Sequence, residues 1–229
     1  MSAPTSAIES VLVENRVFPP SDAIVKAARV SGMADYEALC AEAEKDFEGF
    51  WARQAQANLQ WTKPFTRTLD VSNAPFFQWF ADGELNASAN CLDRHLTAGR
   101  RNKAAIIWQG EPEDDVRHIS YRELLADVVR FANILKKLGV QRGDRVGIYL
   151  PNCTEIVEIE LACYKAGLIK APFNARLSPR EVIEIADNSD AALIVTTAER
   201  AESFRAQLRN PQVRLMLLGN NENNSYERL

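Results

Sequence analysis

The stretch of sequence that decides the fold is RVGIYLPNCTEIVEIELACYKAGLIKAPF, residues 145–173. It begins with a short apolar run at 145–150 and closes with a second one at 168–173. Between them, residues 154–166 have the length and composition of a helix. A strand, a helix and a second apolar strand in succession are typical of a parallel pair that is covered on both faces.

The same alternation extends in both directions along the chain. Further strands are predicted at 104–108, 117–119, 192–196 and 213–218. Further helices are predicted at about 120–138, 179–188 and 199–208. The predicted fold class is therefore α/β: a helical and irregular N-terminal region, followed by a partial, mostly parallel sheet that is flanked by helices.

Two of these helices begin with a capping box. Ser120 and Glu123 form the first box, and Ser178 and Glu181 form the second, with Pro179 at the first helical position. In such a box the serine hydroxyl accepts the amide of the third helical residue, whose carboxylate returns to the serine amide. We interpret both boxes as structural.

The N-terminal part of the chain has a different pattern. Residues 1–20 have no sustained period and predict a mobile tail, or one that is ordered on contact. A short helix is predicted at 22–31 and, from Asp35 on, one amphipathic helix of about twenty residues. The aromatic segment from Trp61 to Gly83 is interpreted as a structural wrap over the main domain rather than as a ligand site. Another short helix is predicted at 86–98.

The composition argues against several classes of protein. The formal net charge is −4 and no run of four basic residues occurs, which argues against nucleic acid as a partner. No apolar run approaches the ~18 residues that span a membrane. The N-terminus lacks the basic leader of a secretory signal, and the four cysteines form no CxxC pair. The predicted compartment is the cytoplasm.

Residues that could carry chemistry are few. Neither GxGxxG nor GxxxxGK[ST] occurs, so the sequence offers no recognised phosphate loop. Arg176 and Arg205 follow predicted strands and could contact an anion or simply be surface charges. Cys91 and His95 are four residues apart on a predicted helix, but with only one other histidine in the chain we predict no metal site.

Two further groups are interpreted as structural. Cys153 precedes a predicted helix, but no histidine base lies near it in the sequence, so packing is favoured over a nucleophilic role. Glu155 and Glu158 share a face of helix 154–166 and are interpreted as part of a solvated surface.

Several motifs resemble a known enzyme family. They are FWARQAQANLQWTKPF at 50–65, WFADGELNASANCLDRH at 79–95, AAIIWQGE at 104–111 and HISYREL at 118–124. Over residues 35–125 the chain resembles the N-terminal region of AMP-forming acetyl-CoA synthetases. Over residues 140–200, with GDRVGIYLPN at 143–152, ACYKAG at 162–167 and PFNARLSP at 172–179, it resembles acyl-CoA ligases more broadly. The resemblance implies an enzyme that activates a carboxylic acid with ATP and magnesium and then transfers the acyl group to coenzyme A.

The resemblance also supplies candidate contacts to coenzyme A. Acetyl-CoA synthetases have Phe-Gly-Gly-Phe-Ser-Pro near coenzyme A, where this chain has Phe173, Asn174 and Ala175. They also have an Arg-Ala-Gly-Arg contact after the next strand, of which this chain keeps only Arg205. These four residues are the candidate coenzyme A contacts. Both departures weigh against an acetate-type site and against acetate as the substrate.

The resemblance divides the chain into a tail (1–20), an acetyl-CoA-synthetase-like region (21–100), a partial AMP-binding (adenylation) domain (101–218) and a polar C-terminal coil (219–229). In the family, the phosphate loop, the acyl pocket and the catalytic lysine lie farther along the chain. We therefore predict no catalytic residue and no bound cofactor in this chain alone, and no activity. One alternative is a non-catalytic interaction module that pairs with a full synthetase or with itself through an exposed sheet edge. The other is an unrelated small-molecule-binding α/β domain.

Overall fold

The computed structural model describes residues 16–219 and 226–228. The chain forms two compact units, Met1–Asn58 with Arg67–Ala81, and Leu59–Thr66 with Asp82–Leu229. Of the tail predicted at 1–20, residues 1–15 lie outside the described residues, and 16–20 have no regular secondary structure.

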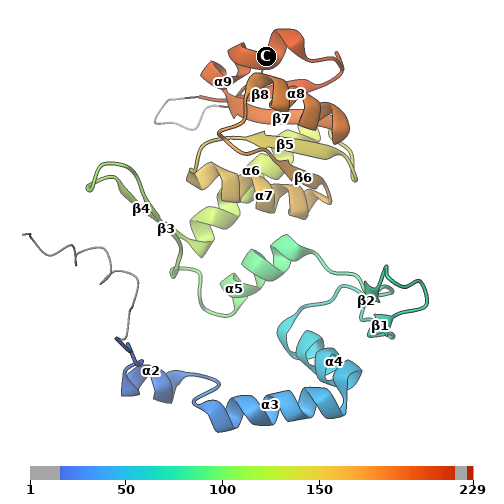
Figure 1. Ribbon diagram of the computed structural model, residues 1–229. Helices are drawn as coiled ribbons and strands as arrows, with labels where there is room; N and C mark the ends of the chain where they lie inside the picture. Colours follow the sequence, from blue (N-terminus) through green and yellow to red (C-terminus); the bar gives the residue numbers. More distant parts are fainter. Residues whose placement is uncertain (1–15, 220–225, 229) are drawn as a thin grey trace, which may run out of the picture. The chain divides into compact units, whose positions relative to one another are not determined.

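The first unit consists of short helices and a small hairpin (Figure 1). Its elements are α2 (Asp22–Ala27), α3 (Met33–Lys45), α4 (Phe47–Asn58), β1 (Leu69–Asp70) and β2 (Gln78–Trp79). The prediction of one long helix from Asp35 is wrong, because the helix breaks at Asp46. The Asp46 carboxylate accepts the amide of Gly49 at 3.0 Å and so caps the start of α4.

The aromatic rings of the first unit pack mainly on one another. Phe47 and Trp51 each contact Trp79 edge-on, with ring centroids 5.8 and 6.4 Å apart. Phe76 and Phe77 are 72% and 57% exposed.

The second unit contains the predicted parallel sheet. Its strands are β5 (Arg145–Tyr149), β6 (Ile169–Pro172), β7 (Ala191–Thr197), β8 (Arg214–Leu218) and β9 (Tyr226–Arg228). They lie in the order β6-β5-β7-β8-β9; the first four are parallel, and β9 is antiparallel to β8. The predicted α/β fold class is thus confirmed.

The prediction of a polar coil at 219–229 is wrong for residues 226–228, which form strand β9. Residues 220–225 and 229 lie outside the described residues. β9 pairs with the outer edge of β8, because an extended segment can bond to the backbone groups of a sheet edge whatever its side chains are.

The predicted strand at 104–108 is present but is not part of this sheet. It forms β3 (Ala104–Gln109), which among the described strands pairs only with β4 (Val116–Ser120), in an antiparallel hairpin. A connection of six residues, 110–115, is too short for the crossover that a parallel pair needs. β3 therefore pairs with β4, the strand that directly follows it in the sequence.

Helices cover both faces of the sheet (Figure 1). They are α6 (Tyr121–Lys137) and α7 (Thr154–Ala166) on one face, and α8 (Pro179–Asn188) and α9 (Ala198–Phe204) on the other. The predicted helix at 86–98 forms η1 (Ala89–Asp93) and α5 (Arg94–Thr97), while η2 (Arg205–Gln207) extends α9. Both predicted capping boxes are confirmed.

Glu158 is buried, not solvated as predicted. Its exposed fraction is 3%, and its Oε2 atom has no hydrogen-bond partner. The packing of α6 against α7 covers this position. Burial and the nearby Glu155 raise the pKa of Glu158 from 4.5 to about 7, against the opposing effect of Arg130 and Arg117.

Replacement of a central α6 side chain tests the packing of this face. Phe131 has no exposed surface, whereas Val129 on the same helix is 40% exposed. We expect Phe131→Ala to lower the free energy of unfolding by about 3–5 kcal/mol, because it leaves a cavity. Urea denaturation would measure this loss. Val129→Ala is the control and should change stability far less; equal losses would contradict the described packing.

The buried carboxyl makes stability depend on pH. Because the pKa of Glu158 is raised in the folded chain, its contribution is fully present below about pH 4.5 and is lost as pH rises through about 7. We therefore expect Glu158→Gln to stabilise the protein at pH 8 relative to wild type and to change it little at pH 5. Chemical denaturation across this range, with Glu202→Gln on α9 as a matched control, would measure the difference. A constant offset between wild type and Glu158→Gln would show that Glu158 does not titrate in this way.

Candidate functional site

The strand order places a topological switch point at the carboxyl edge of the sheet. From β5 the chain crosses to β6 on one side, and it then returns past β5 to β7 on the other side. Ligands of open parallel sheets bind where the strand order reverses in this way, beyond the carboxyl ends of the strands. Here that point lies between the ends of β5 and β7, at Tyr149 and Thr197.

Tyr149 connects the core to the loop that follows β6. Its ring packs beside Phe173 and Phe204, with centroids 6.5 and 6.0 Å away. Its hydroxyl donates to the carbonyl of Leu177 at 2.9 Å. The Thr196 hydroxyl donates to the Tyr149 carbonyl at 2.9 Å. The buried end of β5 therefore fixes one end of the loop at 174–177.

Arg200 fixes the middle of the same loop. It lies in the first turn of α9, which Thr197 caps by accepting the Arg200 amide. The Arg200 Nη1 atom donates to the carbonyl of Ala175 at 2.8 Å. The Arg200 guanidinium carbon is 4.8 Å from the Tyr149 ring centroid, in cation–π geometry. A half-buried cation thus joins α9, β5 and the loop after β6.

Three of the predicted contacts lie together in that loop. Phe173 is 4% exposed, and its ring lies so close to Gly147 that a Cβ there would be 3.0 Å from it. The Asn174 side chain accepts the amide of Arg176 at 2.9 Å, and the Ala175 carbonyl is taken by Arg200. Phe173 is therefore part of the core, while Asn174 and Arg176 are exposed at the edge.

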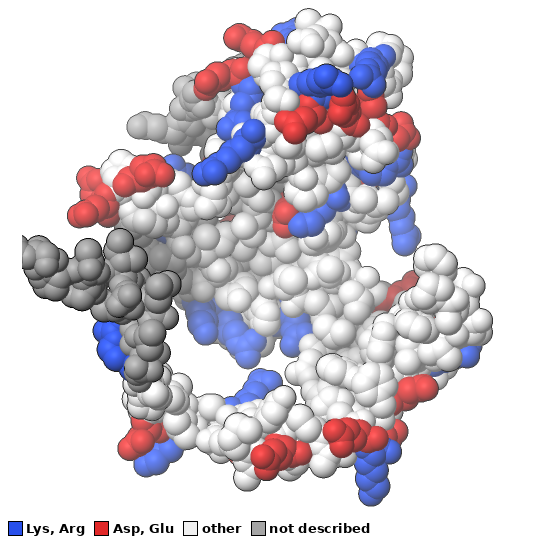
Figure 2. Space-filling model, viewed as in Figure 1, with Lys and Arg blue, Asp and Glu red and all other residues white. Residues whose placement is uncertain are grey.

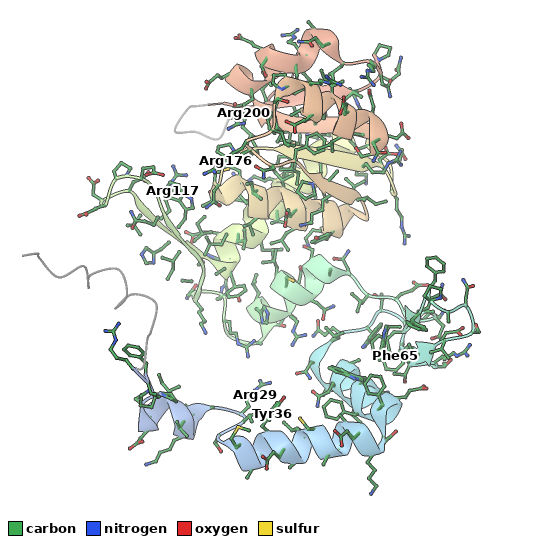
Figure 3. The ribbon with its side chains drawn as sticks, in the orientation of Figure 1. Arg29, Tyr36, Phe65, Arg117, Arg176 and Arg200 are labelled. Atoms are coloured by element: carbon green, nitrogen blue, oxygen red, sulfur yellow. The ribbon has the colours of Figure 1, made fainter. Side chains whose placement is uncertain are left out.

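Arg205, the fourth predicted contact, is exposed on η2. Among the described residues, it has no side-chain hydrogen bond or ion pair with the loop at 174–177. Arg200 was missed as a candidate, although it lies in a segment that directly follows a predicted strand. Its contact with Ala175 depends on the folded loop and leaves no mark in the sequence. Figure 3 shows Arg176 and Arg200 at the same side of the second unit, with Arg117 of β4 below them.

The other reactive side chains are accounted for by packing. Burial and the neighbouring Glu155 raise the pKa of the Cys153 thiol to about 12, so it is protonated and a poor nucleophile. His95 contacts the Arg100 Nη1 atom through Nδ1 at 2.8 Å and packs against the Tyr121 ring. Burial, Arg100 and Arg94 lower the pKa of His95, which favours a neutral ring. Within residues 16–219 and 226–228, no group of three His, Cys, Asp or Glu residues could hold a metal ion.

Charge on the visible surface is mixed. Figure 2 shows acidic and basic side chains close together over the upper part of the second unit, with no broad area of one sign there. No described helix combines the length and the apolar character that crossing a membrane requires.

Two family models match the chain. The model for the AMP-binding enzyme family matches residues 92–227, and the model for the acetyl-coenzyme A synthetase N-terminus matches residues 36–91. The boundary between the matches falls within η1. These matches confirm the resemblance that the motifs indicated.

Individual relatives agree with the models. The acetyl-coenzyme A synthetase of Thiobacillus denitrificans is 49% identical over 201 residues, which are 88% of this chain and 30% of that protein. The enzyme of Cupriavidus pinatubonensis is 47% identical over 201 residues, with the same coverage. The enzyme of Burkholderia mallei is 49% identical over 195 residues, 85% of this chain and 29% of that protein.

The chain thus spans about 30% of the length of the curated relatives that it matches. Within that share, the similarity covers both compact units and includes the loops at the carboxyl edge of the sheet. The chain belongs to the family of AMP-binding enzymes, and it matches the N-terminal region of the acetyl-CoA synthetases.

Proposed function

We propose that these residues form the N-terminal region and the opening part of the adenylation domain of an AMP-forming acyl-CoA synthetase. Such an enzyme converts a carboxylic acid, ATP and coenzyme A into acyl-CoA, AMP and pyrophosphate. The observation that carries the proposal is the match of both family models, end to end, at 36–91 and 92–227. We place the adenylation domain at residues 101–218 and the protein in the cytoplasm.

The carboxyl edge is the part of this chain that we assign to coenzyme A. Its phosphate groups need fixed cations, and arginine is well suited because its planar guanidinium can bind a phosphate with two donors. Arg176 and Arg200 lie at this edge, and Arg205 lies at the end of α9. The residues present therefore fit an anionic ligand.

The loop after β6 also determines what kind of coenzyme A site this edge could form. Asn174 and Ala175 stand where the acetyl-CoA synthetases have glycines, and each adds a side chain to a loop that Arg200 and Tyr149 hold in place. Because the Phe173 ring is buried, that loop would meet coenzyme A through its backbone and through Asn174. Both side chains weigh against an acetate-type coenzyme A site, while the acid itself would be selected by the acyl pocket, which in the family lies farther along the chain.

In an enzyme of this family, ATP and magnesium would be bound mainly by parts of the relatives that these 229 residues do not span. The sequence has no glycine-rich phosphate motif, and adenylation needs strong charge stabilisation at the transferring phosphates. What the chain supplies is the scaffold: a sheet whose carboxyl edge is held rigid by Tyr149 and Arg200.

One observation favours a second candidate function, a non-catalytic module that pairs through a sheet edge. Strand β6 ends the order of the described sheet, and Ile169 on it is 52% exposed. Pro172 and Lys170 on the same strand disfavour edge-to-edge pairing, because proline lacks a donor and lysine resists burial. The synthetase assignment therefore ranks first.

The inactivity of residues 1–229 alone can be tested by ATP–pyrophosphate exchange. We expect no exchange with any of a panel of short-chain, medium-chain and aromatic carboxylic acids, because the phosphate-binding motifs are absent from the sequence. A full-length acetyl-CoA synthetase assayed in parallel is the positive control. Exchange by the 229-residue chain above background would refute this part of the proposal.

The coenzyme A assignment can be tested by binding to the same polypeptide. We expect Arg200→Gln to weaken coenzyme A binding by about tenfold or more, because it removes a cation and loosens the loop. Arg205→Gln tests the arginine that the sequence predicted. Arg200→Lys keeps the positive charge but removes the planar guanidinium with its paired donors. Titration calorimetry gives the dissociation constants. The control is Arg180→Gln on α8, where Arg180 is paired with Glu184. If the Arg200 and Arg205 variants lose no more coenzyme A affinity than this control, coenzyme A does not bind at the carboxyl edge.

A further inference from the structure

A second candidate site lies away from the carboxyl edge. A cleft of about 590 Å³ is bounded by the last turns of α6, the turn at 140–142 and the end of α7. Its lining residues from the turn and from the end of α7 precede β5 and β6, so the cleft lies toward the amino ends of the strands. It is therefore separate from the loops that we assign to coenzyme A.

The walls of this cleft are apolar, and its charges are all positive. The apolar lining residues are Val129, Ala132, Leu135, Val140, Ala166 and Leu168. The charged lining residues are Lys136, Arg142 and Lys165, and no aspartate or glutamate lines the cleft. Lys165 is paired with Asp93 at 2.8 Å. Within the described part of the chain, Lys136 and Arg142 have no carboxylate partner.

The carbonyl groups at the C-terminal ends of α6 and α7 also bear on the charge of the cleft. The Asn86 side-chain amide donates to the carbonyls of Tyr164 and Lys165 at the end of α7, at 3.1 and 3.2 Å. At the end of α6, the Leu135 and Lys136 carbonyls accept backbone amides. Four carbonyl groups at these helix ends that would otherwise repel an anion thus already accept hydrogen bonds.

Arg142 is held near the cleft by a close approach to Gly167. A Cβ atom at position 167 would lie 3.2 Å from the Cγ atom of Arg142, so the arginine stem lies directly against the glycine. Gly167 has a positive φ of 72° at the end of α7, which favours glycine there. The same residue therefore ends the helix and makes room for the cation.

A neighbouring cleft of about 700 Å³ shares Arg142 and Lys165 but includes Glu84 in its lining. A carboxylate there opposes an anionic ligand. The cleft between α6 and α7 combines unpaired cations, the absence of acids and an apolar wall. We propose that this cleft binds an amphipathic carboxylate, its acid group between Lys136 and Arg142 and its hydrocarbon part against the apolar wall.

The test uses the 229-residue polypeptide and octanoate as the probe. Calorimetry should show saturable binding of octanoate to one site at millimolar concentrations or below. Octanol lacks the charge and inorganic phosphate lacks the hydrocarbon, so each should bind at least about tenfold more weakly. Equal binding of octanol, stronger binding of phosphate, or no saturable binding of octanoate would overturn the proposal.

Variants locate the site. The double variant Lys136→Gln/Arg142→Gln should lose about tenfold or more in octanoate affinity, and Asn133→Trp should block the cleft from an exposed position. The matched control is Lys137→Gln/Arg122→Gln, which removes two exposed cations of α6 that do not line the cleft. Equal losses in both double variants would overturn the assignment. Arg200→Gln should leave octanoate binding unchanged, which separates this site from the coenzyme A proposal.

Discussion

Strand β5 is buried on both faces, and the rest of the second unit is arranged around that burial. Val146 and Ile148 enter the core beneath α6 and α7, while Tyr149 enters the core beneath α8 and α9. Gly147, between them, leaves the space that the Phe173 ring occupies. A strand that must satisfy two cores at once cannot slip in register, since one residue of slip would exchange its two faces.

This constraint extends to the carboxyl edge. Tyr149 is the last residue of β5, so its ring is fixed by the core while its hydroxyl is free to hold the carbonyl of Leu177. Arg200 then lies over that ring and takes the Ala175 carbonyl. The loop after β6 therefore has a defined shape without glycine, because Tyr149 and Arg200 each donate a hydrogen bond to one of its carbonyl groups. Asn174 and Ala175 are compatible with such a loop, where a glycine pair would be more flexible.

The sequence predicted those parts of the structure that local signals determine. The predicted bounds of α7 and α8, 154–166 and 179–188, agree with the structure, because caps and periodicity lie within each segment. Features that depend on distant contacts were not predicted. The burial of Glu158 depends on α6, and the role of Arg200 depends on a carbonyl 25 residues earlier in the chain. The break at Asp46 was missed because the apolar stripe continues across it, whereas the cap requires only one carboxylate.

The contacts of Asn86 and Asp93 with the end of α7 affect the order in which the chain can assemble. Asn86 is 78 and 79 residues from its two partners, and Asp93 is 72 residues from Lys165. On the ribosome, the segment around η1 therefore emerges well before the residues that will anchor it. Until α7 has been synthesised, Leu92 can pack only against the α6 part of the core cluster to which it belongs. The contacts of Asn86 and Asp93 with α7 can therefore form only after a further 72 or more residues have been added to the chain.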